Sequence, residues 1–288
     1  MKKLTIVAAS IISALSLSAC SSSQQPAETT APSSSTAAVE ASTDAEEESA
    51  SVEETSEKRV LRVGTEGNMF PWTYTEDNKV VGFEADILNE IGERLGYEID
   101  MQTIKWSGLF GSLDSGRLDT VANIVTINPE REEKYYFTKP YVYNPMVLAT
   151  NGDSDINSMD DIDGRSVVVE AGSSDEQAMD ALEAKMGITL ERVYYEGISI
   201  KDVELGRVDL WIGGEPNLKT NIANGINMKI VGPTDEVQEY GYPFPKTEEG
   251  KALCEEFDQV LDEMHEDGTL TEISERHFGM DVTKPIAE

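Results

Sequence analysis

Apolar residues recur with two different periods along the chain, and these periods predict alternating strands and helices from residue 58 onward. The short, mostly apolar run VLRVGT at Val60–Thr65 predicts a buried strand. In Phe83–Leu95 an apolar residue returns at every fourth position and Gly96 follows, which predicts a helix that ends at a glycine. Strands and helices in this order are typical of α/β proteins with parallel sheets, whose sites lie at the carboxyl ends of strands.

The remaining predicted elements continue this alternation to the C-terminus. They are strands at Ile99–Ile104, Val121–Val125, Ser166–Glu170, Arg192–Tyr194, Leu210–Ile212 and Met228–Val231, and helices at Leu109–Leu113, after Gly172-Ser173-Ser174, near Ile200–Leu205, from Pro216, at Thr247–His265 and at Thr269–Phe278.

Two segments of the chain repeat one pattern. LDSGRLDTVANIV at Leu113–Val125 and VELGRVDLWIGG at Val203–Gly214 each have a helix end, a glycine, a polar step and an apolar strand. The roughly 230 residues from Lys58 onward are enough for two small lobes. The repeat therefore predicts two similarly built α/β units.

The first 57 residues have a different composition. MKKLTIVAASIISALSLSAC combines two lysines, a short apolar run and small residues before Cys20, which is typical of an export signal. LSAC resembles the lipobox of bacterial lipoproteins, so we expect Cys20 to be lipidated; an ordinary signal peptide with an accidental cysteine is the alternative. Residues 21–57 hold nine acidic residues and neither basic nor aromatic ones, which predicts a disordered linker.

Charge and cysteine content exclude several partners and cofactors. Acidic residues outnumber Lys and Arg by 55 to 23, a formal net charge of −32, and Lys58–Glu288 keeps 46 acidic against 21 basic residues. We therefore expect no nucleic-acid partner. With Cys20 lipidated, only Cys254 remains, which allows no intramolecular disulfide and suits a buried apolar position. Two scattered histidines give no zinc-ligand spacing, and no metal or cofactor is predicted.

Four motifs resemble one protein family. They are LRVGTEGNMFPWTYTEDNKVVGFEADILNEIGERLG, KWSGLFGSLDSGRLDTVANIVTINPEREEKYYFTKPY, YGYPFPK and DGTLTEISERHFGMDVTK. Together they resemble the bacterial ABC-transporter solute-binding proteins for polar amino acids, over nearly all of Lys58–Lys284. VTINPEREEKYYFTKPY and FGMDVTK are most similar to the cystine-binding members.

The resemblance implies a two-lobed α/β fold of the type II periplasmic-binding-protein class, with two crossing hinge strands and the ligand in the cleft between the lobes. Lobe one is expected at 58–140 plus 241–288 and lobe two at 146–235. The hinges are expected near Tyr141–Pro145 and Glu236–Tyr240, where they would absorb the backbone change while each lobe moves as a body.

By the same resemblance Arg131 binds the ligand's α-carboxylate, because a planar guanidinium can donate two parallel hydrogen bonds to a carboxylate. The alternative is a surface arginine paired with Glu130 or Glu133. Thr126 corresponds to a carboxylate-binding position and the backbone of Ile124 to an amine-binding carbonyl, with Asn123 beside them.

Further positions in both lobes are implied in the same way. Ser173 and Ser174 resemble a helix-start turn that holds the carboxylate a second time, and an ordinary serine N-cap is the alternative. Trp72 and Trp106 fall where aromatic rings wall the cleft, with core packing as the alternative. Glu66 falls on a polar position, whereas Trp211, inside a strand, is expected in the core.

Three positions depart from the family pattern and leave the ligand open. The acid that commonly binds the α-ammonium falls at Gly214, with Glu215 next to it but on the other face of the strand. Met69 replaces an aromatic residue, and Glu170 stands where ligand side chains are read. We expect Glu66 and Glu170 to compensate for the missing acid.

The predicted function is an extracellular solute-binding protein, anchored by lipid to the outer face of the cytoplasmic membrane. As a monomer without cofactors, it would deliver a polar amino acid, cystine first, to the permease subunits of an ABC importer. Alternatives are a binder of a cationic amino acid or of a carboxylate without an amine, a sensory module, and a dehydratase or lyase using Glu66, Glu170 or Glu215 as acid or base. No catalytic motif supports an enzyme.

Overall fold

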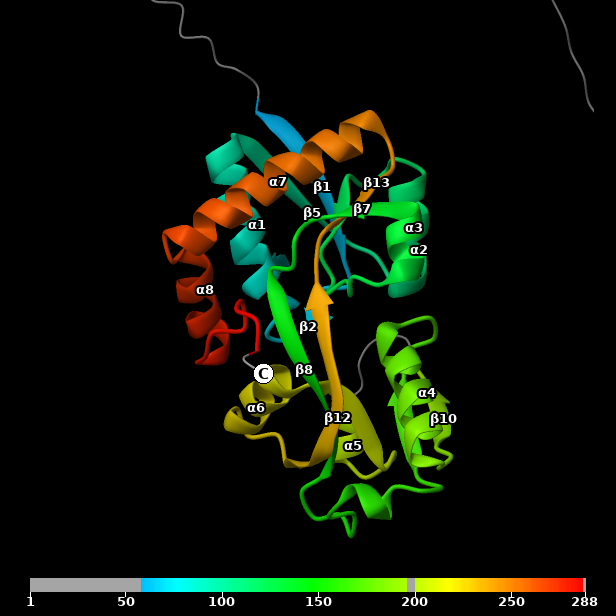
Figure 1. Cartoon of the computed structure of the whole chain (residues 1–288). Helices are drawn as coiled ribbons and strands as arrows, with labels where there is room; N and C mark the ends of the chain where they lie inside the picture. Colours follow the sequence, from blue (N-terminus) through cyan, green and yellow to red (C-terminus); the bar gives the residue numbers. More distant parts are fainter. Residues whose placement is uncertain (1–57, 196–199, 287–288) are drawn as a thin grey trace, which may run out of the picture. The chain divides into compact units, whose positions relative to one another are not determined.

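The computed structural model describes residues 58–195 and 200–286. Cys20 and the predicted linker at 21–57 lie outside the described residues. The described chain forms two lobes, each with its own sheet, and two long strands run between them (Figure 1). Lobe one holds the elements before β8 (Val142–Asn151) and after β12 (Met228–Tyr240), and lobe two holds those between them.

The lobe-one sheet is parallel, as the sequence predicts. β1 (Arg59–Thr65) pairs with β5 (Tyr97–Thr103) on one side and with the short β6 (Thr120–Val121) on the other. Small antiparallel pairings complete the lobe: β2 (Asn68–Met69), β3 (Thr73–Glu76) and β4 (Lys79–Val81) form one sheet, and β7 (Tyr135–Phe137) with β13 (Pro243–Pro245) forms another.

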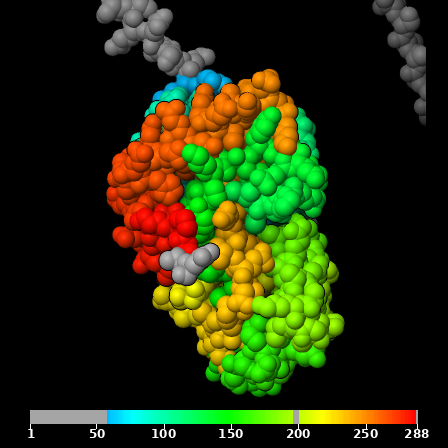
Figure 2. All heavy atoms as spheres, viewed as in Figure 1, coloured from blue at the N-terminus to red at the C-terminus, as the bar shows by residue number. Residues whose placement is uncertain are grey.

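Helices cover both faces of the lobe-one sheet. α1 (Phe83–Leu95), α7 (Glu248–Glu266) and α8 (Thr269–Phe278) bury their apolar faces in one core, which draws residues from both ends of the described chain. α2 (Trp106–Asp114) packs over a smaller second core with Leu118 and Val121. Figure 2 shows α7 and α8, in orange to red, across one face of the lobe.

The lobe-two sheet is mixed, so the expectation of a parallel-type sheet is wrong for part of it. The strand order is β10-β9-β11-β8-β12, with β10 at Glu191–Tyr194, β9 at Ser166–Val169 and β11 at Leu210–Gly214. The first three strands are parallel, whereas β8 and β12 pair antiparallel with their neighbours. The reason is that the chain crosses between lobes along β8 and β12, and both strands join the sheet edge.

Both faces of the lobe-two sheet are buried, because its strands are apolar at successive positions. Val167 and Val169 lie in one core with α4 (Ser174–Met186), whereas Val168 lies in another with α5 (Ile200–Glu204) and α6 (Glu215–Ala223). Successive side chains of a strand point to opposite faces, so a continuous apolar run is needed when helices cover both sides.

The two Gly-Arg-x-Asp segments form the same turn in both lobes. Gly116 and Gly206 have φ of 69° and 67°, the left-handed conformation that favours glycine. The aspartate that follows then accepts from a backbone amide of the lobe's first parallel strand: Asp119 accepts from the Arg62 amide of β1 at 2.8 Å, and Asp209 accepts from the Ser166 amide, at the start of β9, at 2.9 Å.

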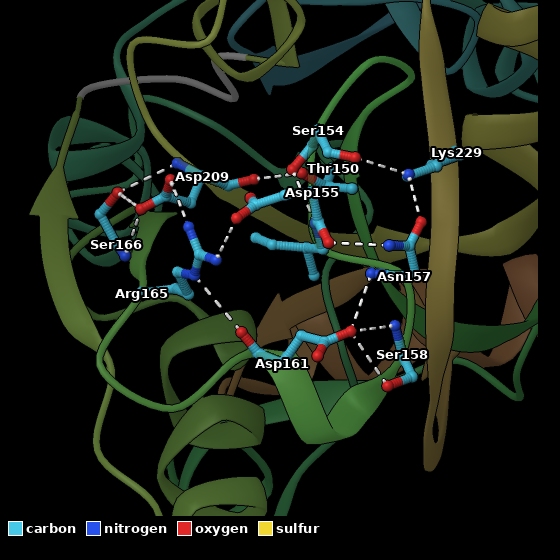
Figure 3. Close-up of polar contacts among 11 residues, drawn as sticks. Thr150, Ser154, Asp155, Asn157, Ser158, Asp161, Arg165, Ser166, Asp209 and Lys229 are labelled. Atoms are coloured by element: carbon cyan, nitrogen blue, oxygen red, sulfur yellow. Dashed lines mark hydrogen bonds and ion pairs between the residues drawn. The ribbon is translucent and has the colours of Figure 1, made fainter.

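In lobe two this turn belongs to a wider polar network (Figure 3). Arg165 lies beside Asp209 and donates to Asp155 at 3.0 Å. Lys229 of β12 donates to the Ser154 carbonyl at 2.8 Å. The network fastens the connection that contains the 3₁₀ helix η1 (Met159–Asp161) to the sheet.

One predicted strand is largely absent. Val121–Val125 was expected as a strand, but only Thr120–Val121 pairs with β1. The chain then leaves the sheet, because Ile124 has φ of 46° and cannot continue a strand. Among the described residues, no helix is both long enough and apolar enough to cross a lipid bilayer. The lobe and hinge boundaries given above remain predictions.

Candidate functional site

A cleft between the lobes brings together residues from the carboxyl ends of strands and the starts of helices. It contains about 570 Å³ of space, counting the part open to solvent. Lobe one supplies Met69, Trp106, Asn123, Ile124 and Arg131; lobe two supplies Val168, Val169, Glu170, Ser173, Ser174, Asp175, Trp211 and Ile212; β12 supplies Gln238. Eight of these residues are among those predicted from sequence.

Arg131 enters the cleft from α3 (Pro129–Lys134), a helix that the sequence starts sharply. Asn128 caps it by accepting from the Arg131 amide at 2.9 Å, and Pro129 supplies a φ suited to the first turn. The guanidinium lies over the Trp106 and Phe110 rings at 5.3 and 5.6 Å and donates through Nη1 to the Thr126 carbonyl at 3.0 Å. The two rings and the carbonyl therefore fix the orientation of the guanidinium.

The Arg131 side chain is partly buried and has no ion pair among the described residues. Burial lowers the pKa of its guanidinium, and Glu130 and Asp175 raise it in part. Within the described ranges no carboxylate oxygen lies within 4.0 Å of it, and Glu130 pairs with Lys134 at 3.1 Å instead. The alternative, in which Arg131 is a surface residue paired with Glu130, is therefore not observed. The remaining guanidinium N–H groups are available to an anion in the cleft.

Ile124 is strained where it lines the cleft. A positive φ is rare for a β-branched residue, and such outliers concentrate at functional sites. Glu84 of α1 holds it, because both carboxylate oxygens accept from the Ile124 amide, at 3.1 and 3.2 Å. Tyr141, just before β8, donates to the same carboxylate. A role for Glu84 was not predicted from the sequence, although a glutamate on the apolar face of a predicted helix could have indicated one.

Glu84 is fully buried, and its protonation is therefore unusual. Burial raises the pKa of its carboxyl to about 7, and the hydrogen bonds from Tyr141 and Ile124 oppose that shift. The group thus connects the strained residue in the cleft to the start of a crossing strand through a carboxyl that titrates near neutrality.

Asn123 and Glu66 form the frame behind the lobe-one wall. Asn123 Oδ1 accepts from the Glu66 amide at 2.9 Å and from the Thr65 hydroxyl at 3.2 Å, which ties the ends of β1 and β6 together. Glu66 Oε1 accepts from the Trp106 amide at 3.1 Å, at the start of α2. Glu66 lines a neighbouring hollow and not the cleft, and its expected contact with ligand stays a prediction.

In lobe two the start of α4 contacts Thr126 of lobe one, a predicted residue that does not line the cleft. Ser173 caps the helix by accepting from the Glu176 amide at 3.2 Å, as the N-cap alternative describes, and it also lines the cleft, so its contact with a ligand stays a prediction. The hydroxyls of Ser174 and Thr126 lie 2.7 Å apart. This contact joins the two lobes directly.

Gln238 on β12 connects both lobes to the crossing strand. Its Oε1 accepts from Thr126 at 3.1 Å and from the Tyr240 hydroxyl at 3.3 Å, and its Nε2 donates to Asp175 at 3.2 Å. Burial raises the pKa of Asp175 to about 6. Neither Gln238 nor Asp175 was predicted, because their approach depends on the tertiary meeting of β12 with α4.

Besides Glu66 and Thr126, three further predicted residues lie away from the cleft. Trp72 is 1% exposed and packs in the lobe-one core against Phe278, which is the core-packing alternative. Gly214 faces Asn144, whose amide lies where a side chain at 214 would begin. Glu215 pairs with Lys219 at 2.8 Å and lines a different hollow.

The sequence predicts Trp211 in the core alone, but in the structure it lies both in a core and at the wall of the cleft. It is 1% exposed and packs in a lobe-two core, yet it also lines the cleft beside Ile212. The end of β9 contributes Val168 and Val169 in the same way. The rule that sites lie at the carboxyl ends of parallel strands could have identified these residues.

Comparison with known proteins agrees with this architecture. Residues 61–280 match the bacterial extracellular solute-binding proteins of family 3. The putative amino-acid ABC transporter-binding protein PatH of Vibrio harveyi is 36% identical over 226 residues, covering 78% of this chain and 90% of that protein. The L-cystine-binding protein TcyA of Bacillus subtilis is 33% identical over 235 residues, covering 79% and 84%.

A solved structure titled as a putative L-cystine ABC transporter from Listeria monocytogenes superposes with a TM-score of 0.70 at 26% identity, covering 78% of this chain and 98% of that one. The fold is accordingly the two-lobed type II periplasmic-binding-protein fold, which confirms the fold that the motifs imply.

Proposed function

The chain belongs to the bacterial extracellular solute-binding proteins of family 3, and we propose that it captures an amino acid in the cleft between its lobes and delivers it to the permease subunits of an ABC importer. Lobe one holds the carboxylate of the ligand, and lobe two closes over the remaining groups of the ligand. No chemical step is required of the protein.

The observation that carries the proposal is the environment of Arg131. Its guanidinium is partly buried, lies over two aromatic rings and donates to one carbonyl, with no carboxylate of the described residues paired to it. A buried cation is costly unless an anion accompanies it. An α-carboxylate accepts two parallel N–H···O bonds from such a guanidinium, and each charge-assisted bond contributes about 1.5–3 kcal/mol.

Cystine is the first candidate ligand, because TcyA and the Listeria structure are named for it. A cationic amino acid is the second candidate. Arg131, which can bind a carboxylate, and Asp175, which can bind a cationic group, both line the cleft.

The proposal includes attachment to the membrane through Cys20, by a lipid added after export. Acyl chains anchor a protein by burying CH₂ groups in the bilayer. Replacement of the sulfur in Cys20→Ser should release the protein into the culture medium. Fractionation tests this, and variant protein that stays in the membrane fraction would contradict it.

Thermal unfolding of the purified chain tests the ligand class. We expect one of L-cystine, L-lysine, L-ornithine or L-arginine to raise the Tm by about 5–10 °C at a hundredfold excess over Kd. Small carboxylic acids without an amine serve as controls and should change the Tm less. A protein stabilised only by such acids, and by no amino acid, would contradict amino-acid binding.

A further inference from the structure

Glu84 is a buried carboxyl that lies behind the wall of the cleft and is not part of that wall. It belongs to the first turn of α1, is 0% exposed and does not line the cleft. Both of its carboxylate oxygens accept from the Ile124 amide, at 3.1 and 3.2 Å, and Oε1 also accepts from the Tyr141 hydroxyl. Glu84 can therefore act on the cleft through Ile124, which does line it.

The contact with Ile124 orients a peptide group at the cleft wall. The N–H and C=O groups of a trans peptide point in opposite directions, so the Asn123 carbonyl points away from Glu84. In the part of the chain that the structure describes, no residue donates a hydrogen bond to the carbonyl of Asn123 or of Ile124. Asn123 is only 4% exposed, and buried carbonyls normally have a donor. These two carbonyls are therefore acceptors for a donor group of the ligand.

The contact with Tyr141 joins the same carboxylate to both crossing strands. Tyr141 immediately precedes β8, and its amide donates to the Tyr240 carbonyl of β12 at 3.0 Å. Its ring stacks on the ring of Tyr242, with the ring centroids 4.4 Å apart. Because the chain passes between the lobes along β8 and β12, Glu84 connects the cleft wall to the strands that link the lobes.

The surroundings of Glu84 contain hydroxyl groups. Burial raises the pKa of its carboxyl to about 7, and the hydrogen bonds from Tyr141 and Ile124 lower it. The titratable groups that face it are the hydroxyls of Tyr141, Tyr240 and Tyr242, and the charge of Glu84 raises the pKa of each. All three hydroxyls stay protonated near neutrality, so Glu84 is the group in this cluster that titrates there.

The charged groups on the adjoining helices are paired with one another. Asp86, also on α1, contacts Nε2 of His277 at 2.7 Å and accepts from Arg276 at 3.1 Å, both on α8. Among the described residues, no charged side chain changes the pKa of Glu84. Its protonation therefore depends on burial and on its two hydrogen-bond donors.

We propose that Glu84 is a positioning residue: its ionised carboxylate holds the Asn123–Ile124 peptide in the ligand-binding conformation, and protonation releases that peptide. A carboxylate accepts at both oxygens, whereas a protonated carboxyl has a hydrogen that itself needs an acceptor. Hydrogen bonds to an ionised acceptor are also roughly twice as strong as those between neutral groups. Protonation therefore weakens the contact that keeps Ile124 at its unfavourable positive φ.

Ligand affinity then depends on pH with a definite sign. The ionised form binds the ligand, so the affinity falls as the pH falls through about 7, the pKa of Glu84. Between pH 7.5 and pH 5.5 the ionised fraction decreases about 25-fold, which sets the largest increase in Kd. This inference rests on the proposed function and adds a proton that regulates it.

Calorimetry of the purified chain and of Glu84→Gln at pH 7.5 and pH 5.5 measures this dependence, with L-cystine, L-lysine, L-ornithine and L-arginine as the ligands. Glu84→Gln keeps the shape of the side chain and cannot ionise. It therefore reports the pH dependence that comes from the ligand itself and from Asp175, which lines the cleft with a pKa of about 6. We expect the increase in Kd at pH 5.5 to be about 5- to 25-fold larger in the unmodified chain than in Glu84→Gln.

Nuclear magnetic resonance without ligand follows the contact itself. In a chain with ¹⁵N-labelled isoleucine, the Ile124 amide signal, assigned by its loss in Ile124→Val, should titrate near pH 7. Tyr141→Phe removes a hydrogen bond that lowers the pKa of Glu84, so the midpoints of the amide signal and of Kd should both move to higher pH. Tyr143→Phe is the control, because Tyr143 lies on β8 and makes no hydrogen bond to Glu84, so both midpoints should stay in place.

The outcomes distinguish this inference from the function on which it rests. If an amino acid binds but the Ile124 amide does not titrate, or the unmodified chain and Glu84→Gln lose affinity equally at pH 5.5, the role of Glu84 is wrong and amino-acid binding stands. If none of the four amino acids binds at either pH, the proposed ligand class is wrong, and so is the coupling of ligand to proton. An amide midpoint that moves together with the midpoint of Kd supports both.

Discussion

The two lobes begin their last parallel strand with the same turn and end it in different ways. Asp119 and Asp209 each bind the amide of the first strand of their lobe, after a left-handed glycine. Past the turn, lobe one leaves the sheet after two paired residues at Thr120–Val121, whereas lobe two continues through the five residues of β11 into α6.

The two strand ends give the cleft different chemistry. We call the segment where the chain leaves the end of this strand the exit. In lobe one the exit contains Asn123 and the strained Ile124, and the buried carboxyl of Glu84 lies behind them. In lobe two the exit is Gly213-Gly214, and the side chains of Trp211 and Asn144 fill the places where their Cβ atoms would lie. Lobe two therefore contributes an apolar wall at this point and takes its polar contacts from the start of α4. The repeated turn and strand predict where a site lies, but the residues at the exit of the strand determine what the site binds.

The largest effect is expected from removing the lobe-one cation. Arg131→Ala deletes both bonds to the ligand carboxylate and leaves that carboxylate desolvated, so we expect a loss of about 3–5 kcal/mol of binding free energy, or two to three and a half decades in Kd. Calorimetry measures this. Lys134→Ala, on the same helix but paired with Glu130 at the surface, is the control and should change Kd less than threefold.

The second effect is a pH dependence of stability that comes mainly from the buried carboxyl behind the lobe-one exit. The pKa of Glu84 is about 7 in the folded protein against 4.5 ordinarily, so between these pH values the folded state holds a proton that the unfolded chain releases. The free energy of unfolding should therefore fall by about 3 kcal/mol as the pH rises through this window. Asp175, with a pKa of about 6, adds to the fall.

Urea unfolding at pH 5 and pH 8 measures this difference, and Glu84→Gln should remove most of it. Asp267 and Asp281, whose pKa values are about 2, lose their stabilising contribution only below about pH 4, outside the window. An unchanged pH dependence in Glu84→Gln would mean that other groups carry it.

A third prediction concerns the lobe-two exit. Gly214→Asp places a Cβ 2.1 Å from the Asn144 amide, so we expect overpacking to cost about 1–3 kcal/mol of stability. Combining it with Asn144→Ala should recover part of that cost, which a double-mutant cycle in chemical denaturation would detect. Gly111→Asp, whose Cβ would meet no atom within 4 Å beyond its chain neighbours and the backbone of its own helix, is the control. Additive costs for positions 214 and 144 would contradict the contact.

The smallest effect compares the two turns themselves. Asp119→Ala and Asp209→Ala each leave a strand amide without its acceptor, at about 1–3 kcal/mol. Asp119 should cost more, because it also accepts from the Arg62 guanidinium at 3.0 Å, whereas Asp209 accepts from the Ser166 hydroxyl at 2.6 Å. Denaturant midpoints measure the difference, and the exposed Asp180→Ala is a control expected within about 0.5 kcal/mol. Equal costs would show that the Arg62 pair adds nothing.

Local signals in the sequence predicted most of the elements. α1 and α8 have the predicted bounds, because each ends at a left-handed glycine, Gly96 or Gly279, which is a signal carried by the chain itself. The strand at Val121–Val125 was wrong because its end is set by Glu84, far away in sequence, which holds Ile124 in a turn.

The residues of the site also fall into those that a local motif predicts and those that no local motif predicts. Arg131, Trp106 and Ser174 follow recognisable motifs and lie in the cleft. Asp175 and Gln238 carry no motif, because their meeting depends on the crossing strand approaching α4. Trp72 and Gly214 do not line the cleft, because they pack against Phe278 and Asn144, and no local pattern contains such tertiary contacts.

The core of lobe one has a consequence for the order in which the protein folds. That core joins residues before Val142, such as Phe83 and Ile87, to residues after Tyr240, such as Phe257 and Phe278. The cores of lobe two use only residues between these limits. A chain emerging N-terminus first therefore completes the sequence of its second lobe before that of its first, whose closure depends on contacts across more than a hundred residues. Because such non-local contacts form slowly, we expect lobe two to be the earlier folding unit and α7 and α8 to be the last elements to dock.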